Sequence, residues 1–199
     1  MTAQIPDTLL IESESFSIIK VRGEGLFHPQ SIGIKPVCTS SACWRGYECH
    51  YAIEDGQLLL RRLVVPISAG AVKLGRVQIF GKKPEIVRPR RIPADEKFLG
   101  IGIAMHEISD ISIPISFSGQ LLAGRDLDAS LYVHMGLQSA YKYRRLKQLT
   151  FDSGALTSLV DRSQDAEAIR ATIPSTTEGF PDRQLKWTTR DLEFMEPSS

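Results

Sequence analysis

Apolar and polar residues alternate with a period of two along much of the chain, most clearly on either side of the Asp-Gly pair at 55–56. This period places alternate side chains on opposite faces of a β-strand. An Asp-Gly pair is favoured in type I′ turns, because both central positions need a positive φ. The stretch therefore predicts a β-hairpin in which Ile53 lies opposite Leu58 and Tyr51 lies opposite Leu60.

The same pattern occurs around Ser118–Gly119 and around Ser153–Gly154. In the first case, alternating apolar residues run from Ile111 to Phe117 before the turn pair. In the second, Phe151 and Leu156 would face each other across the turn. The sequence thus predicts two further hairpins. Their turns are not evenly spaced along the chain, so they are not units of a repeat array.

Short runs of branched residues at 7–13, 16–22 and 97–105 predict additional strands. A further strand is expected at 185–194, close to the end of the chain.

Two stretches favour a helix. The stretch 126–136 fits a period of two as well as a helical period, but Asp126 as a cap and Gly136 beyond the end favour a short helix. The stretch 162–174 predicts a second short helix, with Ser163 as its cap.

Together these elements predict a mainly β protein: a single antiparallel β-barrel or folded-over sandwich, built from hairpins and carrying two short helices. The 199 residues are 42% hydrophobic and 24% charged, which suits one globular domain with its own core. We expect this domain to span residues 1–195 and residues 196–199 to form a frayed tail.

Charge and cysteine content exclude several classes of protein. A net charge of +1 provides no overall field that would attract nucleic acid or an anionic membrane. The first residues do not resemble an export signal and no apolar run approaches the length of a membrane span, so we expect a cytoplasmic protein with no membrane contact. The three cysteines, Cys38, Cys43 and Cys49, are then expected to be reduced and mainly to fill space.

No metal, cofactor or catalytic residue is predicted. The gaps between the cysteines are wider than those of structural zinc sites, and Cys49 and His50 would point to opposite faces of a strand. The motifs of nucleotide-binding loops, serine hydrolases and zinc proteases do not occur in the sequence. Enzyme activity stays open, and binding is the preferred interpretation.

The residues Trp44, Arg45 and Tyr47 precede the first hairpin, and their types commonly anchor protein interfaces. The sequence therefore predicts a protein-binding loop. Alternatively, Trp44 packs against one end of the barrel with Arg45 stacked over it.

A second hypothesis is a barrel that binds a small molecule in an enclosed cavity on which polar side chains converge. Such a barrel could bind the molecule alone or act on it as an enzyme. Its candidate residues are His50, which the hairpin places near Arg61, and Arg125, Tyr132 and His134.

A third hypothesis is nucleic-acid binding through two basic segments, 82–91 and 141–147, the second of which interleaves aromatic and basic residues. The basic residues concerned are Lys82, Lys83, Arg88, Arg90, Arg91, Lys142, Arg144 and Arg145.

Overall fold

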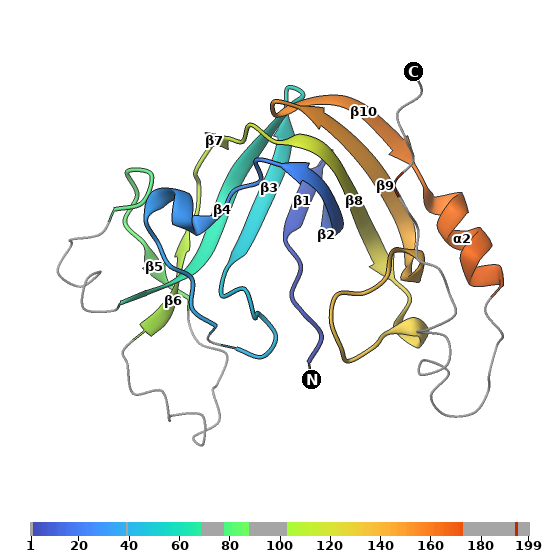
Figure 1. Ribbon diagram of the computed structural model, residues 1–199, viewed down its shortest axis with the longest axis horizontal. Helices are drawn as coiled ribbons and strands as arrows, with labels where there is room; N and C mark the ends of the chain where they lie inside the picture. Colours follow the sequence, from blue (N-terminus) through green and yellow to red (C-terminus); the bar gives the residue numbers. More distant parts are fainter. Residues whose placement is uncertain (1, 39, 69–77, 88–102, 173–193, 195–199) are drawn as a thin grey trace.

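The computed structural model describes residues 2–38, 40–68, 78–87, 103–172 and 194 (Figure 1). In this part of the chain the protein is mainly β, as predicted, and the strands form one ten-stranded mixed sheet. The strands are β1 (Thr8–Ile11), β2 (Glu14–Glu24), β3 (Glu48–Glu54), β4 (Gln57–Ser68), β5 (Glu85–Ile86), β6 (Ile103–Ile108), β7 (Ile113–Pro114), β8 (Ser118–Leu127), β9 (Tyr143–Asp152) and β10 (Ala155–Asp161). The helical elements are α2 (Ser163–Ala171) and the 3-10 turns η1 (Pro29–Ile32), η3 (Ala129–Leu131) and η4 (Ala140–Lys142).

Seven strands follow one another around a ring, in the order β10-β9-β8-β2-β1-β3-β4. The ring closes where the β3–β4 turn meets the β9–β10 turn: Ala155 pairs with Gln57, and the Leu58 amide donates a hydrogen bond of 2.9 Å to the Gly154 carbonyl. Figure 1 shows these two turns together at the top, with the strands spreading apart below them. The predicted barrel is therefore present as a ring of strands.

The sheet differs from the prediction because it is not wholly antiparallel. β1 pairs in parallel with β3, with Thr8 opposite His50. A parallel pair needs a long connection between its strands. Here β2 and the segment from residue 25 to residue 47 provide it. Local alternation cannot reveal such a pairing, since it depends on where a distant segment returns.

The first and third predicted hairpins are confirmed. Ile53 lies opposite Leu58, and the pair at 55–56 has φ angles of 49° and 75°. Phe151 lies opposite Leu156 in the third hairpin. On the polar face of the first hairpin the register differs by one residue from the prediction. A bulge between His50 and Tyr51 brings His50 opposite Arg62, not beside Arg61.

The predicted hairpin around Ser118–Gly119 is wrong. β7, at 113–114, pairs with β4, and β8 begins at Ser118 and pairs with β2 and β9. Gly119 is needed for close approach: a Cβ atom there would lie only 2.1 Å from the carbonyl oxygen of Arg22 on β2. The glycine that suggested a turn therefore lets two strands come together.

One of the two expected helices is confirmed, as α2. Ser163 is its first residue, not its cap, and the Ser163 hydroxyl accepts the Leu146 amide at 3.1 Å. The helix expected at 126–136 is wrong, because Asp126 still belongs to β8. Only the 3-10 turn η3 follows, and it is capped by Asp128, which accepts the amide of Ser130 at 3.1 Å. Of the strand expected at 97–105, residues 103–105 belong to β6, at 103–108, and residues 97–102 lie outside the described residues. The strand expected at 185–194 also lies outside them except for residue 194.

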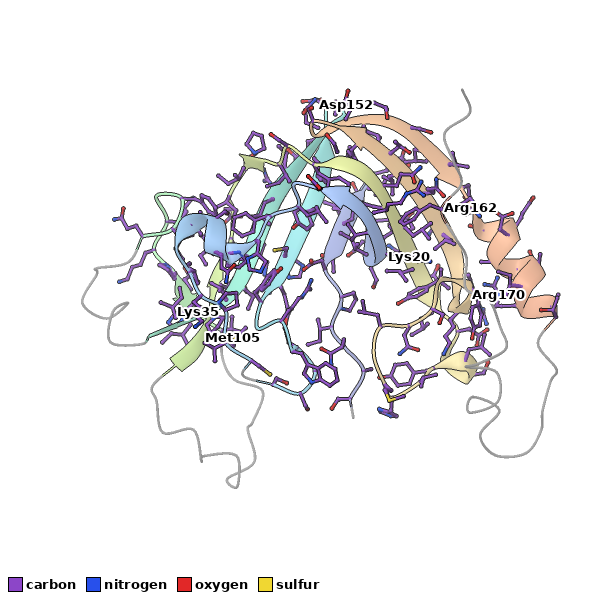
Figure 2. All side chains as sticks on the ribbon, viewed as in Figure 1. Lys20, Lys35, Met105, Asp152, Arg162 and Arg170 are labelled. Carbon is purple, nitrogen blue, oxygen red and sulfur yellow. The ribbon has the colours of Figure 1, made fainter. Side chains whose placement is uncertain are left out.

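Two apolar clusters hold the sheet together. The larger cluster collects buried side chains from six strands of the ring, among them Leu9, Phe16, Cys49, Leu58, Leu121 and Leu149. The partly buried Leu156 of β10 packs against it. The smaller one lies between α2 and strands β8 and β9, around Leu122, Leu146 and Ala166. Arg170 of α2 also donates hydrogen bonds to the carbonyls of Tyr141 and Tyr143, and Figure 2 shows it beside the end of β9. In the described part of the chain no helix is long and apolar enough to cross a membrane.

We expect Gly154→Ala to destabilise the protein by about 3 kcal/mol and Gly56→Ala by only about 1 kcal/mol. Both glycines have a positive φ, of 91° and 75°. Only at Gly154 would a Cβ atom meet another group, the Ile115 carbonyl oxygen at 2.3 Å. Denaturant unfolding of the two variants and the wild type measures the difference. Equal losses would show that Gly154 and the Ile115 carbonyl are not as close as described.

Candidate functional site

The N-terminal segment lies between two loops, one preceding β3 and the other preceding β9 (Figure 1). The Gln4 amide donates to the carbonyl of Gly136 at 2.8 Å, and the Gln4 side-chain oxygen accepts the amide of Trp44 at 2.9 Å. The Ile5 amide donates to the carbonyl of Ala42 at 2.8 Å. One short stretch of chain therefore binds both loops and sets their separation.

Arg45 fixes the first of these loops to the start of β1. Its guanidinium donates two hydrogen bonds of 2.6 Å to the carboxylate of Asp7, and the same carboxylate accepts the Cys49 amide at 2.5 Å. Burial raises the pKa of Asp7 above its ordinary value, while Arg45 and the Cys49 amide act in the opposite direction. The Arg45 guanidinium also lies 5.1 Å from the centre of the Tyr47 ring, so it stacks on Tyr47 and not on Trp44.

Tyr47 and His50 lie away from the loop surface. Tyr47 packs in the larger apolar cluster, and burial raises the pKa of its hydroxyl to about 12. On β3, the His50 Nδ1 atom lies 2.7 Å from the hydroxyl of Thr8. Burial, with a smaller effect of Arg62, lowers the pKa of His50 to about 4, so the imidazole is neutral near pH 7.

Two of the three cysteines fill space as predicted. Cys43 and Cys49 are buried, and burial raises the pKa of both thiols, so they stay protonated near neutral pH. Cys38 is exposed, contrary to the expectation.

Five large apolar side chains are exposed around the N-terminal segment: Ile5, Val37, Trp44, Tyr132 and Leu137. We call this set the Trp44 patch. Its members are between 40% and 54% exposed and come from three separate parts of the chain. Gln4 brings Trp44 and the residue before Leu137 together, and the backbone of Val37 lies directly against Gly46 in the Trp44 loop. Apolar groups gathered at the surface in this way commonly mark a contact site.

A pocket of about 420 Å³ opens beside the patch. Arg125 and Tyr132, two of the residues predicted for a ligand site, both line it. His134 does not line the pocket, but its ring meets the Tyr132 ring edge to face with their centres 5.0 Å apart. The fourth predicted residue, His50, does not line this pocket.

The described residues of the two basic segments differ in their exposure and in their partners. Lys82 and Lys83 are exposed, while Arg88, Arg90 and Arg91 lie outside the described residues. In the second segment Lys142 is buried, Arg144 contacts Asp128 at 3.2 Å, and Arg145 pairs with Glu14. Because Arg144 and Arg145 are consecutive on β9, they point to opposite faces.

Comparison of the chain with protein-family models, with curated proteins and with solved structures finds no match. The arguments for function therefore depend on the geometry of the site alone.

Sequence reasoning missed five residues that build this surface: Gln4, Ile5, Asp7, Val37 and Leu137. A single amide, acidic or aliphatic residue outside a periodic pattern has no local signal that it belongs to a shared surface.

We expect the stability contributed by His50 to be present above pH 6.5 and to be lost as the pH falls toward about 4, because the unfolded chain takes up the proton first. The difference in unfolding free energy between wild type and His50→Asn should shrink by about 2 kcal/mol between pH 7.5 and pH 4.5. Denaturant unfolding at several pH values measures it. A constant difference for His50→Asn would contradict the burial of this imidazole.

Proposed function

We propose that the protein is a non-enzymatic binding protein that engages another protein through the Trp44 patch. The observation that carries the proposal is the convergence of exposed apolar side chains from three parts of the chain around Gln4. Trp and Tyr are the residue types that contribute most to binding free energy when a partner covers them. No catalytic residue is required for this function.

The rigid support beneath the patch favours binding. Arg45 and Gln4 hold the backbone of the Trp44 loop through side-chain hydrogen bonds, so little chain entropy is left to lose when a partner docks. Arg45 was predicted to contact the partner. We propose instead that it supports binding indirectly, by holding the loop that carries Trp44 in place. Tyr132 and Trp44 remain the proposed contacts, and His134 lies next to Tyr132.

A second candidate function is small-molecule binding. It is favoured by one observation, that Arg125 and Tyr132 line the same pocket. Pockets that bind small ligands span roughly 300–1,000 Å³ and combine apolar walls with a few polar groups. The two functions predict different molecules bound to the purified protein. Protein binding predicts a partner protein whose retention depends on Trp44, and small-molecule binding predicts a ligand of constant mass.

Capture from an extract of the native cells, followed by mass spectrometry, tests the proposal. We expect Trp44→Ala to reduce recovery of the partner by about tenfold, because a buried tryptophan anchor contributes more than 1 kcal/mol. The matched control is Ile86→Ala on β5, since Ile86 is 52% exposed and Trp44 is 54% exposed. Ile86→Ala should leave recovery unchanged.

The folded state of both variants is checked by thermal unfolding. A captured protein whose recovery is the same with Trp44→Ala as with wild type would contradict the proposal. Recovery of a small molecule alone would favour the second candidate function.

A further inference from the structure

The pocket and the Trp44 patch form one continuous surface. Ile5, Tyr132 and Leu137 belong to the patch and also line the pocket. A partner that covers the patch therefore lies over the mouth of the pocket. If the pocket stayed empty under an interface, the residues that line it would lose van der Waals contacts. A well-packed partner therefore fills the pocket.

Three of the residues that line the pocket, Ile19, Gly124 and Tyr143, are closely packed against one another. A Cβ atom on Gly124 would lie 2.4 Å from the Cδ1 atom of Ile19 and 2.6 Å from the Cγ atom of Tyr143. The absence of a side chain on Gly124 therefore lets Ile19 and Tyr143 approach β8 from the two neighbouring strands. A volume of about 420 Å³ accommodates a large apolar side chain together with the backbone on either side of it.

Arg125 lines the same pocket and has only long contacts in the described part of the chain. Its nitrogen atoms lie 3.4 Å from the Ser15 carbonyl, 3.7 Å from Asp126 and 3.9 Å from Glu14. The Glu14 carboxylate instead accepts hydrogen bonds from both terminal nitrogens of Arg145, one of them at 2.7 Å. Arg125 can therefore bind a new carboxylate without breaking a short internal ion pair.

A partner that covers the pocket removes water from this guanidinium, which is now about one-third exposed. A guanidinium that loses water without gaining a close acceptor weakens binding, and a carboxylate gives the strongest compensation because it accepts two parallel N–H bonds. Asp126 lies on the Nε side of the guanidinium. The two terminal nitrogens have only the long contacts to the Ser15 carbonyl, at 3.4 Å, and to Glu14, at 3.9 Å, so a closer carboxylate on the partner can replace these contacts.

We propose that the partner presents an extended segment in which a large apolar side chain fills the pocket and a neighbouring Asp or Glu pairs with Arg125. This inference rests on the proposed function, and adds to it the chemistry of the segment that is recognised. An acidic side chain is the stated source of the carboxylate.

A phage-displayed library of random linear peptides, selected on the immobilised full chain, provides the probe. Selected peptides should share an aromatic or leucine residue beside Asp or Glu. One such peptide is then synthesised twice, with the acid and with the corresponding amide, and both are measured by fluorescence anisotropy. Arg125→Gln should weaken the acidic peptide about tenfold and leave the amide peptide unchanged.

The matched control is Arg144→Gln. The Arg144 side chain is 67% exposed and lies outside the pocket lining, and the substitution changes the net charge by the same amount. It should alter binding of the acidic peptide by less than about twofold. Arg125→Lys gives a second test, since it keeps the charge and loses the two parallel N–H donors, and it should give an intermediate affinity.

The outcomes separate the two proposals. If no peptide is selected, or if binding survives both Trp44→Ala and Leu137→Ala, the proposed function and this inference are both overturned. If peptides bind through the patch but contain no acidic residue, or if Arg125→Gln weakens the acid and amide peptides equally, the inference alone is overturned.

Discussion

The ion pair between Asp7 and Arg45, in which two parallel hydrogen bonds join the guanidinium to the carboxylate, is the interaction on which the candidate site depends. A half-buried guanidinium and a largely buried carboxylate are stable together because each satisfies the other, and the Cys49 amide takes a further lone pair. The pair joins the start of β1 to the loop that carries Trp44. Three residues earlier, Gln4 extends the connection to the second loop. The N-terminal segment therefore acts as the common support of a surface whose parts are far apart in sequence.

The ring of strands explains why this surface lies at one end of the molecule. Contact between the β3–β4 and β9–β10 turns closes the ring at the other end, and the strands diverge from there (Figure 1). The diverging ends are linked by longer loops and by the N-terminal segment. Loops on a rigid sheet are where proteins commonly place binding residues. Here the apolar cluster inside the ring supplies the rigidity, and the loops supply the exposed aromatic side chains.

Much of the fold could be predicted wherever a local rule decides the structure. The pair at 55–56 demands two positive φ angles, so its hairpin and the register near its turn followed from sequence. The turn between β1 and β2 was not identified, because Glu12 and Ser13 adopt positive φ without a glycine to signal it. The parallel pairing of β1 with β3 depends on contacts between distant segments, and no local pattern predicts it.

The site could be predicted only in part for the same reason. The residue types before the first hairpin identified Trp44, and the hypothesis of a ligand cavity identified Tyr132; both are exposed near the N-terminal segment. Residue type alone could not show that Arg45 and Tyr47 support the loop from below, or that His50 lies on another part of the sheet. The residues that join the two loops, Gln4 above all, become recognisable only when their hydrogen-bond partners are known.

Hydrogen exchange of the amides in residues 40–47 and 130–138 tests the central claim most directly. We predict that Gln4→Pro speeds exchange in both loops, because proline lacks the amide that donates to the Gly136 carbonyl as well as the side chain that accepts the Trp44 amide. A change at the closed end of the ring, Gln57→Ala, should leave both loops unaffected. Faster exchange in only one loop, or in neither, would contradict the claim that the N-terminal segment joins them into one surface.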